Sequence, residues 1–267
     1  MSELKKIQKP IEKELELFNN KFRQTILTDG GLLNSVVQYV LKRKGKQLRP
    51  VLVFLSAGVC GQINDKTHNA ATLIELMHTA TLIHDDVVDE SYMRRNFFSI
   101  NSLWKNKVAV LIGDYLLARG LLLSVKNNDL SLLEVVTNAV DEMSRGEILQ
   151  IRKSRQLNIT EEEYFEIIEK KTASLIGACT KAGAVSVGAS AQETENLYLF
   201  GINLGVAFQI KDDLFDYELN NNTGKPAGND LKEKKLTLPL IFTRNSCSNR
   251  ERRKLLGIIK SNNQTTS

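Results

Sequence analysis

The sequence contains two copies of an acidic pattern in which a pair of aspartates is followed, three residues later, by a third. The copies are Asp85-Asp86-Val87-Val88-Asp89 and Asp212-Asp213-Leu214-Phe215-Asp216. In a helix, residues four apart lie on one face, about 6 Å along the axis, so the outer aspartates of each copy point the same way. Six carboxylates held together repel unless cations lie between them. Mg²⁺ suits this role because it takes one or two carboxylates and completes its octahedron with water and phosphate. The pattern therefore predicts a magnesium site for a diphosphate substrate.

A single copy of this pattern is more often a solvated helix face than a metal site. Here apolar stretches, residues 80–83 and 205–210, precede the two copies. The carboxylates are thus expected to emerge from buried helix, and two such copies favour metal binding.

Basic residues accompany the acidic motifs, as an anionic substrate requires. Each alone would be read as a solvated surface charge, but together they supply enough cation for two diphosphates. Lys46 and Arg49 are three residues apart, which we interpret as two adjacent positions on the first turn of a helix. The others are Arg94, Arg95, Lys171, Lys225 and Lys235.

The elements that must position these residues read as helices. Apolar residues at three- and four-residue spacing predict helices over residues 70–89, 108–125, 131–150 and 161–190. Their broad apolar faces are typical of helices inside a bundle. Short polar breaks separate them, and Thr160 with Glu163 has the spacing of a capping box.

One longer break, residues 220–230, directly follows the second acidic motif and is rich in Asn, Gly and Pro. Such a segment is not helix. It carries Lys225, and we interpret it as a lid over phosphate, with an ordinary solvated loop as the alternative.

Composition bounds the remaining classes. The chain has 267 residues, 42% of them hydrophobic, and four prolines, which suits one large helical domain over 1–267, with two smaller ones as the alternative. The N-terminus lacks the features of a leader peptide, and Asp114 and Arg119 interrupt the longest apolar region, so no membrane span is expected. Three scattered cysteines fit a reducing cytoplasm, and the net charge of +5 is explained by anionic substrate without nucleic acid.

In these motifs the chain resembles the trans-isoprenyl diphosphate synthase, or polyprenyl synthase, family. The resemblance runs from about residue 40 to residue 239, and the motifs occur in the family's order. They are Gly45-Lys46-Gln47-Leu48-Arg49-Pro50, His84-Asp85-Asp86-Val87-Val88-Asp89 with Arg94-Arg95, Gly113-Asp114-Tyr115-Leu116, Lys171-Thr172, Phe208-Gln209-Ile210-Lys211-Asp212-Asp213 through Asp216, and Lys235-Leu236-Thr237-Leu238-Pro239.

The resemblance implies an all-α isoprenoid synthase fold, a bundle of long helices around a deep central cavity, with about three Mg²⁺ ions per active site. Asp85, Asp89 and Asp212 would bind the ions directly, and Asp86, Asp213 and Asp216 would support them. The implied ligands of the allylic diphosphate are Arg94, Lys171, Lys225 and Lys235. Those of isopentenyl diphosphate are Lys46, Arg49, His78 and Arg95, with Phe208 beside the isopentenyl group.

The implied reaction joins isopentenyl diphosphate head-to-tail to an allylic diphosphate. The metal ions and lysines stabilise the departing diphosphate, an allylic carbocation forms, and the isopentenyl double bond attacks it. Thr172, Gln209 and Gln150 are candidates to place oxygen dipoles near the cation. The released diphosphate is the expected proton acceptor.

Product length is expected to depend on Ala80 and Thr81, five and four residues before Asp85. Short-chain members of the family place an aromatic there, and this chain does not. The first motif also lacks the two-residue insertion of one class of bacterial short-chain synthases. Both features favour a long-chain product, hexaprenyl to octaprenyl, with geranylgeranyl or farnesyl diphosphate as the alternative.

Family members continue for several helices beyond the Thr-Leu-Pro motif, so their C-terminal helices are expected to be absent here. A homodimer is expected, with residues 108–125 as a candidate interface. A class I terpene cyclase would lack the Lys46 and Arg49 pair, and a non-catalytic partner subunit would have lost carboxylates that this chain retains.

Overall fold

The structure is a computed structural model, and it describes residues 3–42, 45–94, 97–154, 158–217 and 236–261. The chain divides into two compact units. Unit 1 comprises Met1–Val140 with Ile176–Gly201, and unit 2 comprises Asp141–Leu175 with Ile202–Ser267. The prediction of one domain over 1–267 stays a prediction.

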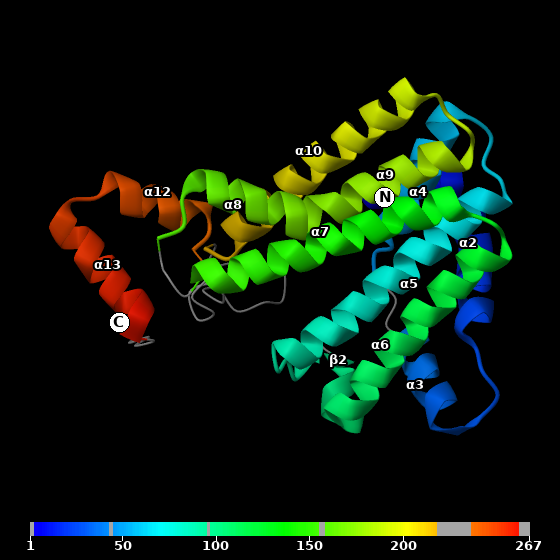
Figure 1. Cartoon of the computed structure of the whole chain (residues 1–267), viewed down its shortest axis with the longest axis horizontal. Helices are drawn as coiled ribbons and strands as arrows, with labels where there is room; N and C mark the ends of the chain where they lie inside the picture. Colours follow the sequence, from blue (N-terminus) through cyan, green and yellow to red (C-terminus); the bar gives the residue numbers. More distant parts are fainter. Residues whose placement is uncertain (1–2, 43–44, 95–96, 155–157, 218–235, 262–267) are drawn as a thin grey trace. The chain divides into compact units, whose positions relative to one another are not determined.

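Unit 1 is built from helices and one short hairpin (Figure 1). Its first elements are α1 (Glu3–Gln8), η1 (Lys9–Ile11), α2 (Glu12–Ile26), α3 (Gly31–Lys42), α4 (Leu48–Cys60) and α5 (Asp65–Val88). The hairpin of β1 (Met93–Arg94) and β2 (Phe97–Phe98) leads into α6 (Ile100–Lys126). The unit also holds the first part of α7 (Leu130–Ser154), most of α9 (Ser174–Ser186) and the first part of α10 (Ala191–Phe215).

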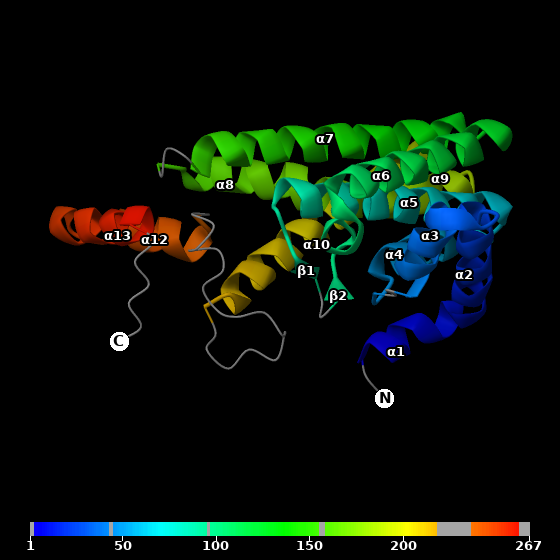
Figure 2. The same ribbon diagram turned by 90° about the horizontal axis from the view of Figure 1, so that it is seen from below.

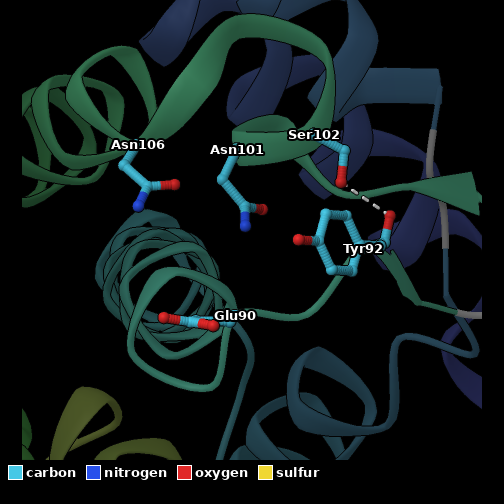
Figure 3. A pocket seen from close by; sticks show the side chains of 5 residues that line it. All are labelled: Glu90, Tyr92, Asn101, Ser102 and Asn106. Carbon is cyan, nitrogen blue, oxygen red and sulfur yellow. Dashed lines mark hydrogen bonds between the residues drawn. The ribbon is translucent and has the colours of Figure 1, made fainter.

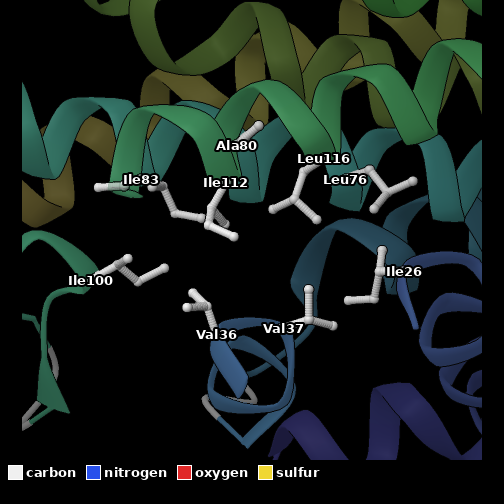
Figure 4. Packing of buried hydrophobic residues seen from close by; sticks show 10 residues of the cluster. Ile26, Val36, Val37, Leu76, Ala80, Ile83, Ile100, Ile112 and Leu116 are labelled. Carbon is white, nitrogen blue, oxygen red and sulfur yellow. The ribbon is translucent and has the colours of Figure 1, made fainter. Parts of the chain in front are cut away.

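One hydrophobic core cluster of unit 1 lies between α5, α6 and α3. α5 and α6 run side by side in both views (Figures 1 and 2). Leu76, Ala80 and Ile83 of α5 meet Ile112 and Leu116 of α6, and all five are buried (Figure 4). Val36 and Val37 of α3 close the cluster. Burying each large aliphatic side chain contributes roughly 1.5–3 kcal/mol, so this cluster holds the end of α5 on α6.

Unit 2 contains the second part of α7, then α8 (Glu161–Ile168), the five-residue π-helix η2 (Glu169–Ala173) and the second part of α10. It ends with α12 (Leu238–Ser246) and α13 (Asn249–Ser261). Tyr164, Ile167 and Ile168 of α8 pack with Leu240 and Ile241 of α12.

The all-α prediction is confirmed, and the expected helices are present with shifted ends. The capping box of Thr160 and Glu163 is confirmed. The single helix expected over residues 161–190 is wrong in detail, because η2 interrupts it and it ends at Ser186. α6 begins at Ile100, earlier than expected, and contains a kink at Lys105, whose φ is 69°.

By length and composition alone, α6 could cross a membrane. One face of it packs against α5 and α3 in the core of unit 1, as core helices of this kind do. The absence of a membrane span therefore stays a prediction.

Candidate active site

The first acidic motif lies at the C-terminal end of α5. Asp85 and Asp86 are in the last turn, and Asp89 is the C-cap. The expectation that all three are helical is thus wrong for Asp89, yet its N–H still donates to the Asp85 carbonyl at 2.8 Å. A helix C-terminus carries partial negative charge, and no basic residue lies in this last turn. A cation bound here would stabilise the carboxylates.

Main-chain contacts hold this motif in place. Asp86 is 3% exposed, whereas Asp89 is exposed. The Asn101 side-chain amide donates to the Asp86 carbonyl at 3.1 Å and to the Ser91 carbonyl at 3.2 Å. The Ser91 N–H also donates to the Asp86 carbonyl, at 2.9 Å. The start of α6 therefore sets the path of the chain just after the motif.

His84 packs into a socket on α6. A Cβ added to Gly113 would overlap the His84 ring, with Cε1 at 2.8 Å, so only glycine leaves room for it. His84 Nε2 is 3.2 Å from the Val110 carbonyl and 3.5 Å from an Asp114 carboxylate oxygen. His84 and Gly113 belong to separate motifs of the sequence, and the structure brings them together.

The predicted diphosphate ligands of unit 1 are only partly placed. α4 begins at Leu48, after Gln47 in left-handed conformation with φ 51°, so Arg49 is in the first turn and Lys46 precedes the helix. The prediction that both lie on one helical turn is wrong for Lys46. His78 is buried, with its carbonyl accepting from the Thr81 hydroxyl at 2.9 Å. The Arg94 side chain and Arg95 lie outside the described residues.

The two residues expected to set product length differ in burial. Ala80 is fully buried in the cluster between α5, α6 and α3 (Figure 4). Thr81 is partly exposed. A bulky side chain at Thr81 therefore has more room than one at Ala80.

The second acidic motif ends α10 as the first ends α5. Asp212 and Asp213 are in the last turn, and Asp216 lies just beyond Phe215, the last helical residue. Asp213 is 6% exposed, and both of its carboxylate oxygens accept hydrogen bonds. The donors are the Tyr164 hydroxyl at 2.6 Å and the Gln209 amide at 2.7 Å.

Burial raises the pKa of the Asp213 carboxyl above its ordinary value. The hydrogen bonds from Tyr164 and Gln209 oppose this rise, and the charges of Asp212 and Asp216 add to it. Two neighbouring carboxylates thus increase the free energy of the ionised site, which again favours a bound cation.

A hydrogen-bonded chain connects this motif to η2. The Thr172 hydroxyl donates to the Gln209 side-chain oxygen at 2.9 Å, and Gln209 in turn donates to Asp213. Gln209 is thereby fixed between the π-helix and the acidic motif. Thr172 and Gln209, predicted to lie near the reacting carbon, are brought together.

Lys171 also lies in η2, and α7 supplies its partners. Its ammonium donates to the Gln150 side-chain oxygen at 2.8 Å and pairs with the Glu147 carboxylate. α7 approaches closely because residue 146 is glycine: a Cβ there would be 2.8 Å from the Lys171 amide nitrogen. π-helical segments within α-helices are frequent at functional sites, where they displace side chains from the α-helical register.

Phe208 is 52% exposed. Lys225, Lys235 and the expected lid over residues 220–230 lie outside the described residues.

The carboxylates suit a hard divalent cation. Among the described residues, no three His, Cys, Asp or Glu side chains lie close enough to hold a metal alone. Mg²⁺ does not need such a set, because one or two carboxylates, water and substrate phosphate complete its coordination. In each motif the middle aspartate is buried and the outer two are less so.

The chain belongs to the Polyprenyl synthetase family, whose sequence profile matches residues 31–267. It is therefore a prenyltransferase of isoprenoid biosynthesis, a polyprenyl diphosphate synthase that uses isopentenyl diphosphate and an allylic diphosphate. The family uses divalent metal ions.

Individual relatives agree with this assignment. An all-trans-nonaprenyl-diphosphate synthase (geranyl-diphosphate specific) of Rhodobacter capsulatus is 39% identical over 87% of this chain and 72% of its own length. A decaprenyl diphosphate synthase crystal structure from Rhodobacter capsulatus matches with TM-score 0.91 and 33% identity, over 99% of this chain and 82% of that one. A polyprenyl synthase from Caulobacter crescentus CB15, complexed with calcium and isoprenyl diphosphate, matches with TM-score 0.88 and 35% identity, over 98% and 80%. Structures of geranylgeranyl pyrophosphate synthases match as well.

Sequence reasoning missed three residues that support the predicted functional residues: Asn101 in unit 1, and Tyr164 and Glu147 in unit 2. A signal existed for Tyr164, which lies seven residues, about two turns, before Lys171. Glu147 lies three residues before Gln150 and thus on the same face of α7. Nothing in the sequence pattern marks Asn101, because its role depends on where the chain turns after Asp89.

Proposed function

We propose that this protein is a magnesium-dependent synthase of long-chain all-trans polyprenyl diphosphate, of hexaprenyl to octaprenyl length. One observation carries the metal-dependent part: each acidic motif ends a helix, with its middle aspartate buried and its outer aspartates more accessible. Cations stabilise such an arrangement, and a diphosphate completes their coordination.

The aspartates divide into two roles in this proposal. Asp85, Asp89 and Asp212 bind the Mg²⁺ ions, about three per site, together with substrate phosphate. Asp86, Asp213 and Asp216 support them. Tyr164 and Gln209 already donate hydrogen bonds to the two carboxylate oxygens of Asp213. This arrangement supports a role for Asp213 in orienting the motif in preference to binding metal.

The basic residues hold the two diphosphates. Arg94, Lys171, Lys225 and Lys235 bind the allylic diphosphate, and Lys46, Arg49, His78 and Arg95 bind that of isopentenyl diphosphate. The partners of the Lys171 side chain support its role in binding the allylic diphosphate. Glu147 and Gln150 hold its ammonium in one position, which reduces the entropy lost when it meets the leaving group.

The residues of this chain then act on the reacting carbon. Bound divalent ions supply the charge that stabilises the leaving diphosphate. The Thr172 hydroxyl donates its hydrogen to Gln209. The lone pairs of the Thr172 oxygen therefore remain available to an allylic cation. Phe208 presents an exposed ring beside the isopentenyl group, and the proton lost at the end passes to the released diphosphate.

The proposal also covers the length of the product chain. The absence of an aromatic at Ala80 and Thr81 and the names of the long-chain relatives support a long product. The matches named as geranylgeranyl pyrophosphate synthases favour geranylgeranyl diphosphate as the second candidate.

The test is incubation of purified protein with Mg²⁺, isopentenyl diphosphate and, separately, dimethylallyl, geranyl, farnesyl and geranylgeranyl diphosphates. Mass spectrometry of the dephosphorylated alcohols should show products longer than geranylgeraniol. A stop at geranylgeraniol would refute the long-chain proposal, and no product from any primer would refute activity of this chain alone.

A substitution locates the residue that limits length. Ala80→Phe would overpack the core at a cost of about 1–3 kcal/mol, so Thr81→Phe is the better variant. It should shorten the product, whereas Thr81→Ser, which keeps the hydroxyl bond to His78, should not. Unchanged products from Thr81→Phe would place the limit elsewhere.

We also propose a homodimer in the cytoplasm, with α6 at the interface. Leu111, Leu121, Leu122 and Val125 lie on one face of α6 and are 43–62% exposed. The double variant Leu121→Ser/Leu122→Ser should reduce the mass in analytical ultracentrifugation from that of two 30.0 kDa chains to one. Val59→Ser, at a 78% exposed position on α4, is the control. An unchanged mass for the double variant would exclude this interface.

A further inference from the structure

The hairpin after the first acidic motif exposes four large apolar side chains. Tyr92, Met93, Phe97 and Phe98, called here the hairpin patch, are 74%, 56%, 45% and 55% exposed. They come from a segment of seven residues that starts three residues after Asp89. Single exposed apolar residues are ordinary, but such a cluster marks an interaction surface.

The main chain of the hairpin patch is held firmly. Met93 pairs with Phe98 across the two strands. The Tyr92 carbonyl accepts from the Ser102 hydroxyl at 2.8 Å (Figure 3) and from the Ser99 N–H at 3.0 Å. The Tyr39 hydroxyl of α3 donates to the Phe98 carbonyl at 2.7 Å. These bonds fix the main chain of the hairpin. Because side chains alternate along a strand, Met93 and Phe98 lie on one face of the hairpin and Tyr92 and Phe97 on the other, so exposed apolar side chains cover both faces.

A small polar pocket lies behind the patch. It has a volume of about 240 Å³ and is lined by Glu90, Tyr92, Asn101, Ser102 and Asn106 (Figure 3). The Asn101 amide and the Ser102 hydroxyl in this pocket donate to main-chain carbonyls of Asp86, Ser91 and Tyr92, which anchors the hairpin.

Lysines lie near the patch, on the helices that border Phe98. The Tyr39 ring packs edge-on against Trp104 with centroids 5.3 Å apart, which brings the end of α3 and the start of α6 beside Phe98. Lys42 follows Tyr39 by one turn, and Lys105 follows Trp104 directly; both are exposed. Lys107 is exposed as well. The acidic residues that precede the hairpin are Asp85, Asp86 and Asp89 of the metal motif and Glu90 of the pocket.

We propose that the hairpin patch docks this protein on an anionic lipid bilayer. Aromatic side chains favour the membrane–water interface, where their rings sit at headgroup level, and lysines beside them are attracted to anionic headgroups. A second copy of the chain is the poorer occupant, because it would bring the same lysines together. The net charge of +5 agrees with this choice.

Docking explains why the patch follows the metal motif so closely. The substrate and product of a polyprenyl synthase carry a hydrocarbon chain on a diphosphate, as membrane lipids carry chains on a phosphate headgroup. Tyr92, which would contact the bilayer, is three residues along the chain from Asp89 of the metal motif. The proposal goes beyond the synthase activity and does not depend on the length of the product.

The test is flotation of the full chain with vesicles of phosphatidylcholine alone and of phosphatidylcholine with phosphatidylglycerol. The protein should bind the anionic vesicles and be released by salt. Phe97→Ser/Phe98→Ser should lower the affinity by about tenfold or more. Val59→Ser is the matched control, because it removes a more exposed apolar side chain near Asn64, at the opposite end of the 24-residue α5, about 36 Å away.

The single tryptophan of the sequence provides a direct signal. The Trp104 ring packs against Tyr39, whose hydroxyl donates to the Phe98 carbonyl, so Trp104 lies close to the hairpin patch. The fluorescence emission of Trp104 should therefore shift to shorter wavelength on addition of anionic vesicles. The double variant should lose this shift while its thermal melt stays close to that of the wild type. Should the double variant melt early, Lys105→Gln/Lys107→Gln replaces it and should weaken binding to anionic vesicles alone.

Three results would overturn the proposal. The first is no binding of the wild type to anionic vesicles. The second is equal binding by Phe97→Ser/Phe98→Ser and the wild type, which would assign any membrane affinity to another surface such as α6. The third is a change of oligomeric mass in the double variant without lipid, which would make the patch an interface between protein chains.

Discussion

The same three-aspartate motif lies at the C-terminal ends of α5 and α10, and in each the middle residue is buried, Asp86 at 3% and Asp213 at 6% exposure. Their supports differ. Asp86 is held through its main chain, by Asn101 and Ser91, and its neighbour His84 sits over Gly113. Asp213 is held through its side chain, by Tyr164 and Gln209.

This difference shows two ways to aim repelling carboxylates. A main-chain support fixes where the helix end lies. A side-chain support also stabilises the ionised carboxylate, because its donors bind the charged oxygens. The first motif should therefore respond to changes in packing, and the second to changes in hydrogen bonding and pH.

The largest effect should come from the outer aspartates, where the motifs are alike. Asp85→Asn and Asp212→Asn should each lower kcat by about a hundredfold or more, because each removes charge that holds the metal ions. Steady-state assays at several Mg²⁺ concentrations measure this. Asp141→Asn, whose carboxylate pairs with Arg145 on an exposed turn of α7, should retain activity. Equal activity of Asp85→Asn and wild type would contradict the metal role of the first motif.

Packing should dominate at the first motif. Gly113→Ala places a methyl group in the His84 ring and should raise the Mg²⁺ concentration needed for half-maximal activity by about tenfold, at a cost of about 1–3 kcal/mol in folding. Gly58→Ala, in α4 with open space around it, should be neutral or stabilising.

A double variant tests the cause. His84→Ala removes the ring that the new methyl group meets, so Gly113→Ala should be less harmful in that background. Additive effects of the two substitutions on the Mg²⁺ requirement and on the thermal melt would show that the socket does not couple them.

The lysine beside the second motif allows a matched pair of substitutions on α7. Glu147→Gln removes the ionic partner of Lys171 and should lower kcat by about tenfold, because the ammonium loses its fixed position. Glu142→Gln acts on the neighbouring Lys170, which keeps its pair with Glu166 at 3.0 Å, and should leave kcat near wild type. Similar losses in both variants would show that Glu147 acts through the general charge of α7.

The smallest effect should be on stability at Asp213, and it should depend on pH. Burial raises the pKa of Asp213, so its protonated form is favoured in the folded state and the benefit is lost as pH rises through the folded pKa. Tyr164→Phe removes a donor to the carboxylate and raises that pKa further. The variant should lose about 1–3 kcal/mol near neutral pH and less at acid pH, measured by urea unfolding of metal-free protein. A loss that is the same at both pH values would show that Asp213 is not the group affected.

Much of the site could be predicted because its residues are close in sequence. The aspartate spacing, Lys171 with Thr172, and the Thr160 capping box follow from helix periodicity, a local property. Lys46 was misplaced because a left-handed Gln47 ends the preceding segment one residue before α4. Glu147 and Asn101 were missed because their partners lie on other helices.

The sequence by itself determined the class of this protein: helical periods, two aspartate motifs and ordered basic motifs sufficed for an all-α polyprenyl synthase. Tertiary structure alone decided which aspartates are buried, that Ala80 lies in the core while Thr81 does not, and that His84 occupies a socket at Gly113. The physical reason is the distance along the chain over which each property is determined. Periodicity and capping depend on neighbours within a turn or two, whereas burial and hydrogen-bond partners depend on helices that packing brings together from distant parts of the chain.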